Sequence, residues 1–431
     1  MTPVMSELPS TVEAWLGYIE SLHPASIEMG LSRVQKVAAR LQLKFPFTVI
    51  TVGGTNGKGS TCAMLECIYR DAGYRVGCYT SPHLVHYQER VRFNGALIDD
   101  NVLCAAFLAV ELARGDISLT YFEMGTLAAL WAFEQQPLDV VILEIGLGGR
   151  LDAVNIVDAD CAIVTNVDLD HMEFLGDTRE LIGQEKAGIY RKDQIAICGD
   201  ANPPASLLEH AKKLGLPLQR FGIDYKIETH HQDHALYSDA QGQLAIGSLR
   251  LLGDYQWNNA ANVIYAVRAL QSRLPVTEAC LLQGLTGTEV VGRFQYWHRS
   301  PDIILDVAHN PHAARALRSN LQQLSRNGGK VFAVFSMLSD KDIVSVVDIL
   351  HDAIDAWEIA PIQHPRAASA DHLKECLALK VPEWLVTVHA DLPAALRSCY
   401  RKAAKNDKII VFGSFFTVAA ILELTSDQWI S

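Results

Sequence analysis

The stretch that decides the fold is Gly53-Gly54-Thr55-Asn56-Gly57-Lys58-Gly59-Ser60, between a β-branched run at 48–52 and a helical pattern at 58–72. In such a unit, glycines let backbone N–H groups surround phosphate oxygens, and the helix N-terminus adds a partial positive charge. Lys58 can neutralise the outer phosphates, and the hydroxyl of Ser60 or Thr61 can approach Mg²⁺. The stretch predicts a nucleotide-binding loop, with a plain glycine-rich turn as the alternative.

The loop departs from the strict Walker pattern in two ways. The spacing before Gly57 is short, and Gly59 stands where Ser or Thr should follow the lysine. A hydrolase that uses ATP or GTP as a switch would have the strict pattern and an aspartate at a strand end. The departures therefore disfavour that class.

Outward from the loop, strand and helix patterns alternate. The near-continuous apolar runs DVVILEIG (139–146) and CAIVTNV (161–167) indicate strands covered on both faces, which is typical of a mostly parallel sheet. Ser10 with Glu13 predicts a capping box at a helix start. The remaining patterns predict helices at 31–41, 101–113, 122–136, 178–187, 257–270 and from Thr277, and short antiparallel strands within 222–255.

A second α/β pattern restarts near Gly292. Its predicted strands are IILDVA (303–308), KVFAVFSM (330–337), WEIAPI (357–362), LVTVH (385–389) and KIIVFGS (408–414). We therefore predict an α/β protein of two domains. A P-loop-type, mostly parallel sheet domain with a small antiparallel subsheet spans 1–290, and a smaller Rossmann-like α/β domain spans 296–431.

Composition narrows the classes of function. Of 431 residues, 49% are hydrophobic, and 49 acidic against 37 basic side chains give a net charge of −12, which argues against duplex nucleic acid as a partner. The N-terminus lacks the pattern of a secretory signal, and no run of about 18 apolar residues appears. The nine scattered cysteines indicate buried free thiols. We expect a cytoplasmic protein that does not bind membranes.

Polar residues follow the predicted strands, where doubly wound folds bind ligands. Ser81 can offer a hydroxyl to Mg²⁺, or it is simply a turn residue before proline. Glu144 ends an apolar strand, and an ionised carboxylate there is costly without a cation, so we favour a metal role. His171 in the loop Asp168-Leu169-Asp170-His171 is a ligand or a surface residue. Lys186, late in its helix, faces phosphate or solvent.

The motifs GTNGKGS, SPHL, LEIGLGGRLDAVNI, LDH, EKAGI, GRFQ and DVAHNPHAA occur in this order between about Leu22 and Val418. Together they closely resemble the folylpolyglutamate synthases, including the bacterial bifunctional dihydrofolate synthase/folylpolyglutamate synthases of the Mur ligase superfamily. The resemblance implies that a carboxylate attacks the γ-phosphoryl of ATP and that the amine of L-glutamate then displaces phosphate. Dihydropteroate and tetrahydrofolate would be the carboxylate substrates. Positioning and charge neutralisation are then the work of the protein.

The resemblance also implies site residues. Ser81 and Glu144 would bind one Mg²⁺, and Glu144, His171 and Lys186 a second. Lys186 would be N6-carboxylysine, because carbamylation by CO₂ turns an ammonium into an anionic oxygen ligand. Lys58, Lys186 and His309 would be catalytic. ATP would contact Thr55, Asn56, Gly57, Lys58, Gly59, Ser60, Asn259, Arg293 and Asp306.

For Arg293, a salt bridge in the hinge is the alternative. For Asp306 and His309, it is capping of the helix that starts near Pro311. If these residues contact ATP, closure of the second domain would complete the site and exclude water from the acyl phosphate.

For the acceptor and glutamate, the resemblance is weaker in detail. It places the acceptor against Ser21, Leu22, His23, Pro24, Thr120, Tyr121, Phe122, Glu123 and Leu151, and it places glutamate near Ser414. A Tyr-Phe pair at a helix start is also typical of a core. Before the LDH motif, Asp168 differs from the residue found in many relatives. Its carboxylate either lies near the metals or faces solvent. A peptidoglycan-building Mur enzyme is disfavoured because no UDP-binding domain fits before the loop. We expect a monomer.

Overall fold

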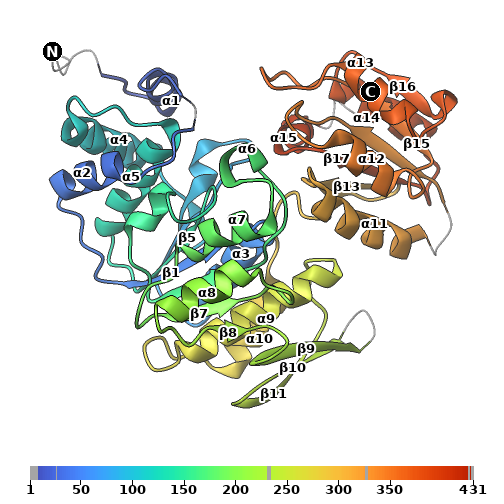
Figure 1. The fold of residues 1–431 in the computed structure, drawn as a ribbon. Helices are drawn as coiled ribbons and strands as arrows, with labels where there is room; N and C mark the ends of the chain where they lie inside the picture. Colours follow the sequence, from blue (N-terminus) through green and yellow to red (C-terminus); the bar gives the residue numbers. More distant parts are fainter. Residues whose placement is uncertain (1–7, 26, 231–233, 326–328, 426–427, 429–431) are drawn as a thin grey trace. The chain divides into compact units, whose positions relative to one another are not determined.

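The structure, a computed structural model, describes residues 8–25, 27–230, 234–325, 329–425 and 428 (Figure 1). The chain divides into two compact units. The first contains 1–83, 87–249 and 257–288, and the second contains 84–86, 250–256 and 289–431. No sequence pattern predicts that 84–86 and 250–256 belong with the second unit.

The first unit is built on a mostly parallel sheet in the strand order β4-β3-β2-β5-β1-β6-β7-β8, in which β3 and β4 form the antiparallel edge. Its strands are β1 (Thr48–Gly53), β2 (Val76–Tyr79), β3 (Val91–Phe93), β4 (Ala96–Leu97), β5 (Val140–Glu144), β6 (Cys161–Val164), β7 (Ile195–Cys198) and β8 (Gln219–Arg220). β1 lies in parallel between β5 and β6. The carboxyl ends of these three strands therefore meet at one edge of the sheet.

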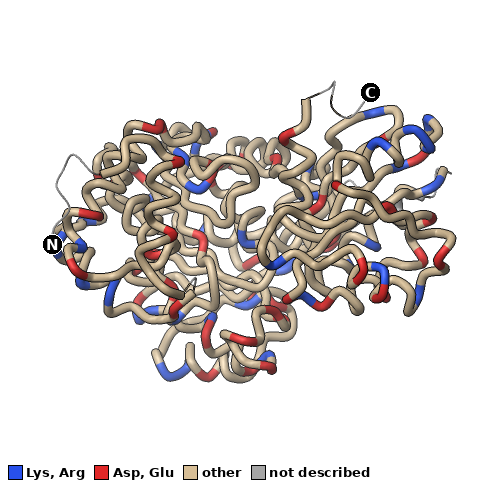
Figure 2. The backbone as a smooth tube through the Cα atoms, turned by 90° about the horizontal axis from the view of Figure 1, so that it is seen from above, with Lys and Arg blue, Asp and Glu red and all other residues tan. Residues whose placement is uncertain are grey.

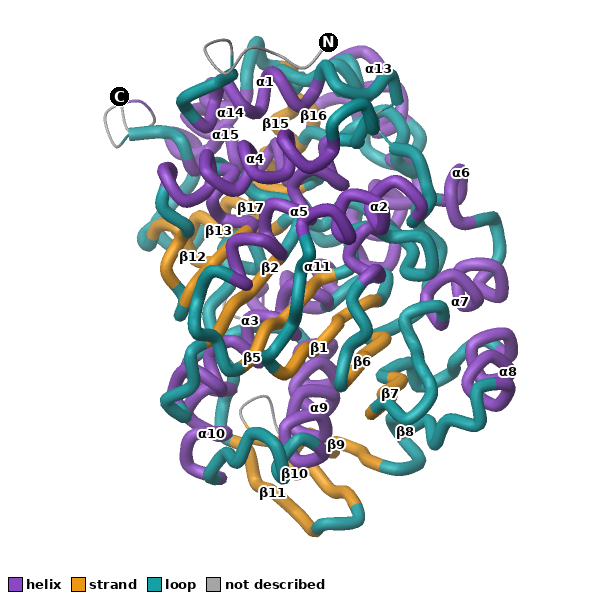
Figure 3. The backbone as a smooth tube through the Cα atoms, turned by 90° about the vertical axis from the view of Figure 1, so that its left-hand side faces the viewer, coloured by secondary structure: helices purple, strands orange, loops and turns teal. Residues whose placement is uncertain are grey.

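Helices cover both faces of this sheet. On one face, side chains such as Val49, Val141 and Leu143 pack in one core with α1 (Val12–Glu20), α2 (Ser32–Leu41), α4 (Asp100–Arg114) and α5 (Tyr121–Glu134). Figure 3 shows α2, α4 and α5 in front of the strands. α3 (Lys58–Asp71) packs against α10 (Glu278–Gly287) and against the strands β1, β2 and β5.

The predicted antiparallel subsheet is present beyond β8. It consists of β9 (Tyr225–His230), β10 (His234–Asp239) and β11 (Gly242–Ile246), in the order β11-β10-β9. The other helices of the first unit are α6 (Met172–Leu175), α7 (Arg179–Ala187), α8 (Ala205–Lys213) and α9 (Asp254–Ala269), of which α9 belongs to this unit from Trp257 onward. Short 3-10 helices are η2 (Tyr87–Arg90) and η3 (Ala153–Ile156).

The second unit has its own sheet in the order β12-β13-β17-β14-β15-β16, parallel except for β12. Its strands are β12 (Gln295–His298), β13 (Asp302–Asp306), β14 (Val331–Phe335), β15 (Ala356–Ile359), β16 (Val386–Val388) and β17 (Lys408–Phe412). Its helices are α11 (Pro311–Ser325), α12 (Ile343–Leu350), α13 (Ala370–Ala378), η4 (Glu383–Leu385), α14 (Leu392–Lys402) and α15 (Phe415–Leu422).

The predicted fold class is confirmed, and two details are corrected. The first helix is capped by Thr11, whose side chain accepts from the Ala14 N–H, and not by Ser10. All nine cysteines are free of disulfides, but Cys67, Cys104 and Cys280 are half-buried instead of buried.

The structure shows how charged positions are distributed along the chain and how apolar its helices are. Acidic and basic positions are interspersed along the backbone (Figure 2). Among the described residues, every helix is too short or too polar to cross a membrane.

Close packing of α10 on α3 predicts a sharp difference between two glycines of α10. A methyl group on Gly284 would lie 2.6 Å from the Cα of Ile68, whereas one on Gly287 would meet nothing within 4 Å. Because the Ile68 backbone cannot yield cheaply, Gly284→Ala should destabilise the first unit by about 1–3 kcal/mol. Thermal denaturation followed by circular dichroism measures the effect.

Gly287→Ala is the matched control. It should be neutral or stabilising by up to about 1 kcal/mol, because alanine is the better helix former. Equal melting temperatures for the two variants would contradict the described contact between α10 and α3.

Candidate active site

Two glycines shape the loop between β1 and α3. Gly54 and Gly57 have φ angles of 141° and 84°, which L side chains rarely adopt. A methyl group on Gly54 would lie 1.9 Å from the Thr165 hydroxyl oxygen, and one on Gly57 would lie 2.4 Å from the Asn259 side-chain oxygen. Both positions therefore require glycine. The structure also brings the predicted residue Asn259 against the loop.

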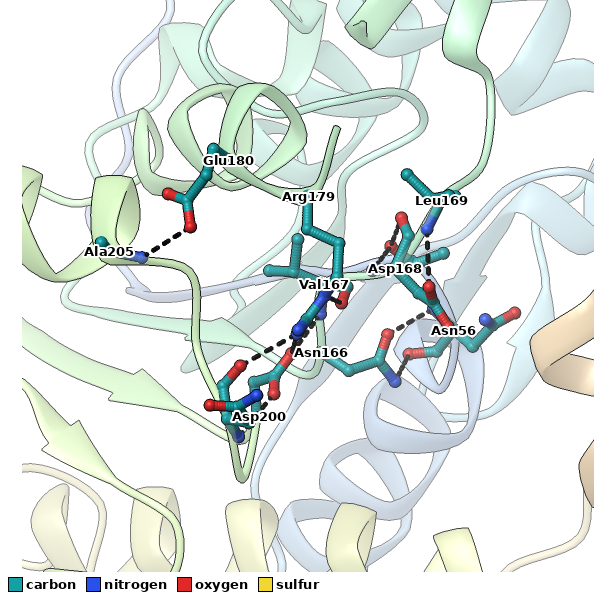
Figure 4. Close-up of polar contacts among 11 residues, drawn as sticks. Asn56, Asn166, Val167, Asp168, Leu169, Arg179, Glu180, Asp200 and Ala205 are labelled. Carbon is teal, nitrogen blue, oxygen red and sulfur yellow. Dashed lines mark hydrogen bonds and ion pairs between the residues drawn. The ribbon is translucent and has the colours of Figure 1, made fainter. Parts of the chain in front are cut away.

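The segment that follows β6, residues 165–168, is hydrogen-bonded to this loop (Figure 4). The backbone N–H groups of Thr55 and Asn56 donate to the main-chain and side-chain oxygens of Asn166, each at 3.0 Å. The Thr165 hydroxyl donates to the Asn56 carbonyl at 2.6 Å. These two N–H groups are thus occupied within the protein. Phosphate oxygens can be reached by the N–H groups from Gly57 onward, at the start of α3.

The ion pair of Arg179 with Asp200 fixes the same segment at Val167. Asp200 accepts from the Val167 N–H at 2.7 Å, and Arg179 donates to the Val167 carbonyl at 2.9 Å. The two side chains also pair with each other at 3.0 Å (Figure 4). Val167 is therefore fixed at both its backbone polar groups.

Asp168, the departure noted in the sequence, is tied to the same loop. Its N–H donates to the Thr55 hydroxyl at 2.9 Å, and its carbonyl accepts from that hydroxyl at 3.1 Å. Its carboxylate accepts from the Leu169 N–H at 2.8 Å and is half-buried. Asp168 thus fixes the loop through its backbone.

The Lys58 ammonium folds back over the loop. It donates to the carbonyl oxygens of Gly54 at 3.0 Å and Thr55 at 3.2 Å. A lysine ammonium is a compact charge with three N–H donors on a flexible side chain, so it can exchange one partner for another. Lys58 is therefore placed where a phosphate can replace backbone carbonyls as its partner.

Glu144 lies at the carboxyl end of β5 and is 4% exposed. One of its oxygens accepts from the Ser81 N–H at 2.9 Å, and the other lies 3.9 Å from where a Gly59 methyl group would be. The structure therefore brings together Glu144, Ser81 and the start of α3, as predicted.

Lys186, in the last turn of α7, is buried, which rules out the solvated alternative. Burial, which is the largest cause, and the charge of Lys58 together lower the pKa of its ammonium to about 7, against the opposite effects of Asp170 and Asp152. A lysine with this pKa is largely an uncharged, nucleophilic amine slightly above neutral pH.

Asp152 is a further buried acid that acts on Lys186, and it is not among the predicted site residues. It accepts from the N–H groups of Leu147 and Val154 at 2.8 and 2.9 Å. Burial raises the pKa of its carboxyl to about 6, although these hydrogen bonds and the charge of Lys58 act to lower it. Its position within the GLGGRLD motif, as an acid followed by an apolar run, was the available signal.

His171 is the most exposed of the predicted metal ligands. Its side chain is 39% exposed, and its Nε2 lies 4.0 Å from a carboxylate oxygen of Asp170. Asp170 in turn acts on Lys186, so the loop lies near the other charged groups. Within the described residues, no three His, Cys, Asp or Glu side chains gather closely enough to hold a metal ion by themselves.

In the second unit, Asp306 ends β13 and is buried. It accepts from the N–H groups of Phe294 and Ala308 at 2.9 and 2.8 Å, and so joins two loops. Burial raises the pKa of its carboxyl to about 6, and Arg293 acts to lower it. The guanidinium of Arg293 lies 5.7 Å from the Phe415 ring centroid.

The capping alternative for Asp306 and His309 is wrong. Asn310 accepts from the Ala313 N–H at 2.9 Å at the start of α11. His309 instead places its Nδ1 2.9 Å from the Val307 carbonyl, which fixes a proton on that nitrogen. Capping of α11 therefore does not explain either residue.

The predicted acceptor residues 120–123 begin α5 with a capping box. The Glu123 N–H donates to the Thr120 hydroxyl at 3.2 Å, and the Thr120 N–H donates to Glu123 at 2.8 Å. Glu123 also pairs with Arg33 at 2.9 Å. These polar groups thus hold the helix start, while the Phe122 ring lies where a Gly146 methyl group would be, within 2.5 Å.

Polar side chains connect the 21–24 segment to the start of α5. His23 pairs with Glu28 at 3.0 Å, and Glu28 in turn pairs with Arg33. Ser21 ends α1 and donates to the Tyr18 carbonyl at 2.6 Å. Ser21 and Pro24 are exposed, whereas Leu22, Tyr121 and Leu151 are half-buried.

Ser414 is buried between β17 and α15. Its hydroxyl oxygen accepts from the Thr417 N–H at 2.9 Å, so it caps α15. The predicted contact with glutamate is not needed to explain this residue.

Two sequence models of domains match the chain. The Mur ligase middle domain matches residues 52–267, and the Mur ligase glutamate ligase domain matches residues 292–415. With the nucleotide-type loop and its buried acid, these matches define the class as an ATP-dependent ligase of the Mur type.

Relatives narrow the class. The dihydrofolate synthase/folylpolyglutamate synthase of Escherichia coli K12 is 47% identical over 96% of both chains, and that of Haemophilus influenzae is 40% identical over 97% of this chain and 98% of its own. The chain therefore belongs to the dihydrofolate synthase/folylpolyglutamate synthases of the Mur ligase family.

Solved structures of this family have the same fold as this chain. E. coli FolC in complex with DHPP and ADP superposes with a TM-score of 0.90 at 46% identity, covering 96% of this chain and 97% of its own. A bifunctional synthase with Mn, AMPPNP and L-glutamate bound superposes at 0.88 and 43% identity, covering 98% and 99%.

The contact of Gly57 with Asn259 predicts a local defect in nucleotide binding. Gly57→Ala would add a strained φ and a clash with the Asn259 side chain. We expect the affinity for ATP to fall by about tenfold or more, which corresponds to about 1.4 kcal/mol. Isothermal titration with ATP and Mg²⁺ measures it.

Gly73→Ala is the matched control, because Gly73 has a similar φ of 87° but no neighbour within 4 Å of an added methyl group. It should lower stability by about 1–2 kcal/mol from the φ strain and leave ATP affinity unchanged. Equal loss of affinity in both variants would mean that Asn259 does not lie against the loop.

Proposed function

We propose that this chain uses ATP to join L-glutamate to dihydropteroate, giving dihydrofolate, and to tetrahydrofolate, giving polyglutamates. A carboxylate is a poor acyl donor. Transfer of the γ-phosphoryl group to a carboxylate oxygen gives an acyl phosphate, and the glutamate amine then forms the amide as phosphate leaves. The observation that carries the proposal is the meeting of Lys58, Glu144 and buried Lys186 at one edge of the first sheet.

The roles of these residues follow from their settings. Lys58, which now contacts two backbone carbonyls, would bind the β- and γ-phosphates, with N–H groups from Gly57 to Ser60. Ser81 and Glu144 would hold one Mg²⁺, which neutralises charge on the phosphates. The fit is supported by the burial of Glu144, since an ionised carboxylate there requires a cation.

For the second unit, we propose that Arg293, Asp306 and His309 contact the nucleotide and that glutamate binds near Ser414. The hydrogen bond from Nδ1 of His309 to the Val307 carbonyl orients the imidazole ring, and the Asp306 carboxyl keeps its two loops in place. By the same resemblance, residues 1–290 would form the ATP-binding domain and 296–431 the glutamate-binding domain. We propose a cytoplasmic monomer.

Turnover with each acceptor tests the function. With ATP, Mg²⁺ and L-glutamate, ADP release should require either dihydropteroate or tetrahydrofolate, and mass spectrometry should show one added glutamate. Lys58→Ala and Glu144→Ala should each lower ADP release by about 100-fold or more, because each removes a charge that neutralises the transferring phosphoryl group.

Lys36→Ala and Glu209→Ala, at exposed positions on α2 and α8, are the matched controls and should keep full activity. A response to tetrahydrofolate alone would make the chain a monofunctional folylpolyglutamate synthase. A response to neither acceptor would favour another Mur-type amino-acid ligase. Normal turnover of a folded Lys58 or Glu144 variant would remove that residue from the mechanism.

We also propose that Lys186 is carbamylated and, with Glu144 and His171, holds a second Mg²⁺. Carbamylation joins the amine nitrogen to the carbon of CO₂ and releases a proton, so it needs the uncharged amine. Because burial lowers the pKa of Lys186 to about 7, the uncharged fraction rises as the pH increases through 7.

Incubation with ¹³C-labelled bicarbonate should therefore give a carbamate NMR signal in the wild type that is absent in Lys186→Arg. The same variant should lose activity by more than about tenfold. Lys36→Arg should keep both the signal and the activity. A signal that survives in Lys186→Arg would exclude Lys186 as the site of the modification.

A further inference from the structure

Arg90, at the end of η2, is a buried cation without an acidic partner. It is 9% exposed, and among the residues that the structure describes no carboxylate pairs with it. Arg114, which is also 9% exposed, pairs with Glu111 at 2.6 Å. Buried guanidinium groups are normally compensated in this way, because an unpaired charge in a protein interior is costly.

The contacts of Arg90 hold its side chain without neutralising it. Its Nε donates to Nδ1 of His83 at 2.8 Å, so that this ring nitrogen carries no proton. Its guanidinium carbon lies 5.3 Å from the ring centroid of Tyr87 and 5.6 Å from that of Tyr121. Burial raises the pKa of the Tyr79 hydroxyl, and Arg90 counteracts that rise. These aromatic groups stabilise a cation but supply no countercharge.

Arg90 contacts two parts of the proposed site, the segment before Ser81 and the start of α5. Its carbonyl accepts from the Thr80 N–H at 2.9 Å, next to Ser81, which contacts Glu144. On its other side, Tyr121 belongs to the start of α5, where the acceptor is proposed to bind. A carboxylate that is to receive a phosphoryl group must lie between these parts.

We propose that Arg90 binds the acceptor carboxylate that is to be phosphorylated. The inference rests on the proposed function and adds a residue to its acceptor site. Since Nε is engaged with His83, the terminal nitrogens would hold one carboxylate oxygen and leave the other to attack phosphorus. Dihydropteroate has a single carboxylate, which must be the one that is phosphorylated. Tetrahydrofolate must place the carboxylate that reacts at the same point, so Arg90 would bind the reacting group of both acceptors.

Steady-state kinetics of Arg90→Gln tests the proposal. The KM for dihydropteroate and for tetrahydrofolate should each rise about 10- to 100-fold, which is the effect expected for a lost charge-assisted hydrogen bond. The KM for ATP should stay within about threefold. Arg90→Lys keeps the charge and should restore part of the affinity.

An acceptor analogue separates binding from packing. A dihydropteroate analogue whose carboxylate is replaced by hydrogen lacks the group that Arg90 would hold. As a competitive inhibitor it should bind equally to the wild type and to Arg90→Gln, whereas dihydropteroate should discriminate between them. This ratio is independent of any general loss of stability.

Arg114→Gln is the matched control. Because its partner Glu111 would be left buried without a cation, with only the Tyr18 hydroxyl donating to it, the melting temperature should fall while the acceptor KM stays within about twofold. If Arg90→Gln behaves in the same way, Arg90 is a packing residue and the inference is wrong. Selective loss of tetrahydrofolate binding would also overturn it. Failure of the wild type with both acceptors would instead contradict the proposed function.

Discussion

The parallel pairing of β1 with β5 on one side and β6 on the other is the constraint on which the site depends. In this register Val52 lies beside Glu144 and beside Ile163. The loop that leaves β1 therefore begins next to the buried acid at the end of β5, and next to the segment that leaves β6. A shift of one residue in the pairing of β5 with β1 would turn Glu144 to the opposite face.

Burial gives these few charges their effect. Lys58 and Lys186 repel each other strongly enough to contribute to the lowered pKa of Lys186, and Asp152 and Asp170 oppose that change. In a medium less polar than water such interactions are stronger than at the surface. The backbone that carries them must then be rigid. Asn166, Arg179 and Asp200 supply that rigidity by fixing the segment between the phosphate loop and α7 (Figure 4).

Much of this arrangement could be predicted from the sequence, because periodicity and strand-end residues are local signals. The helix starting near Lys58, the strand ending at Glu144 and the antiparallel subsheet follow from such patterns. The choice of Thr11 over Ser10 as a cap could not, since both residues can accept the same kind of hydrogen bond.

Burial of Lys186 and the loop-joining role of Asp306 were also beyond local reasoning. Both depend on segments far apart in the chain. Asp152 was missed for a different reason: its partners Leu147 and Val154 are close to it in the sequence, but they belong to a turn whose shape appears only in three dimensions.

The raised pKa of Asp152 and the lowered pKa of Lys186, about 6 and about 7, have a consequence for the exchange of protons in the first unit. Asp152 changes its protonation state around pH 6 and Lys186 around pH 7, so near these pH values a proton can be gained or lost there at little free-energy cost. Binding of a polyanion or a cation beside these groups can therefore be coupled to the uptake or release of a proton.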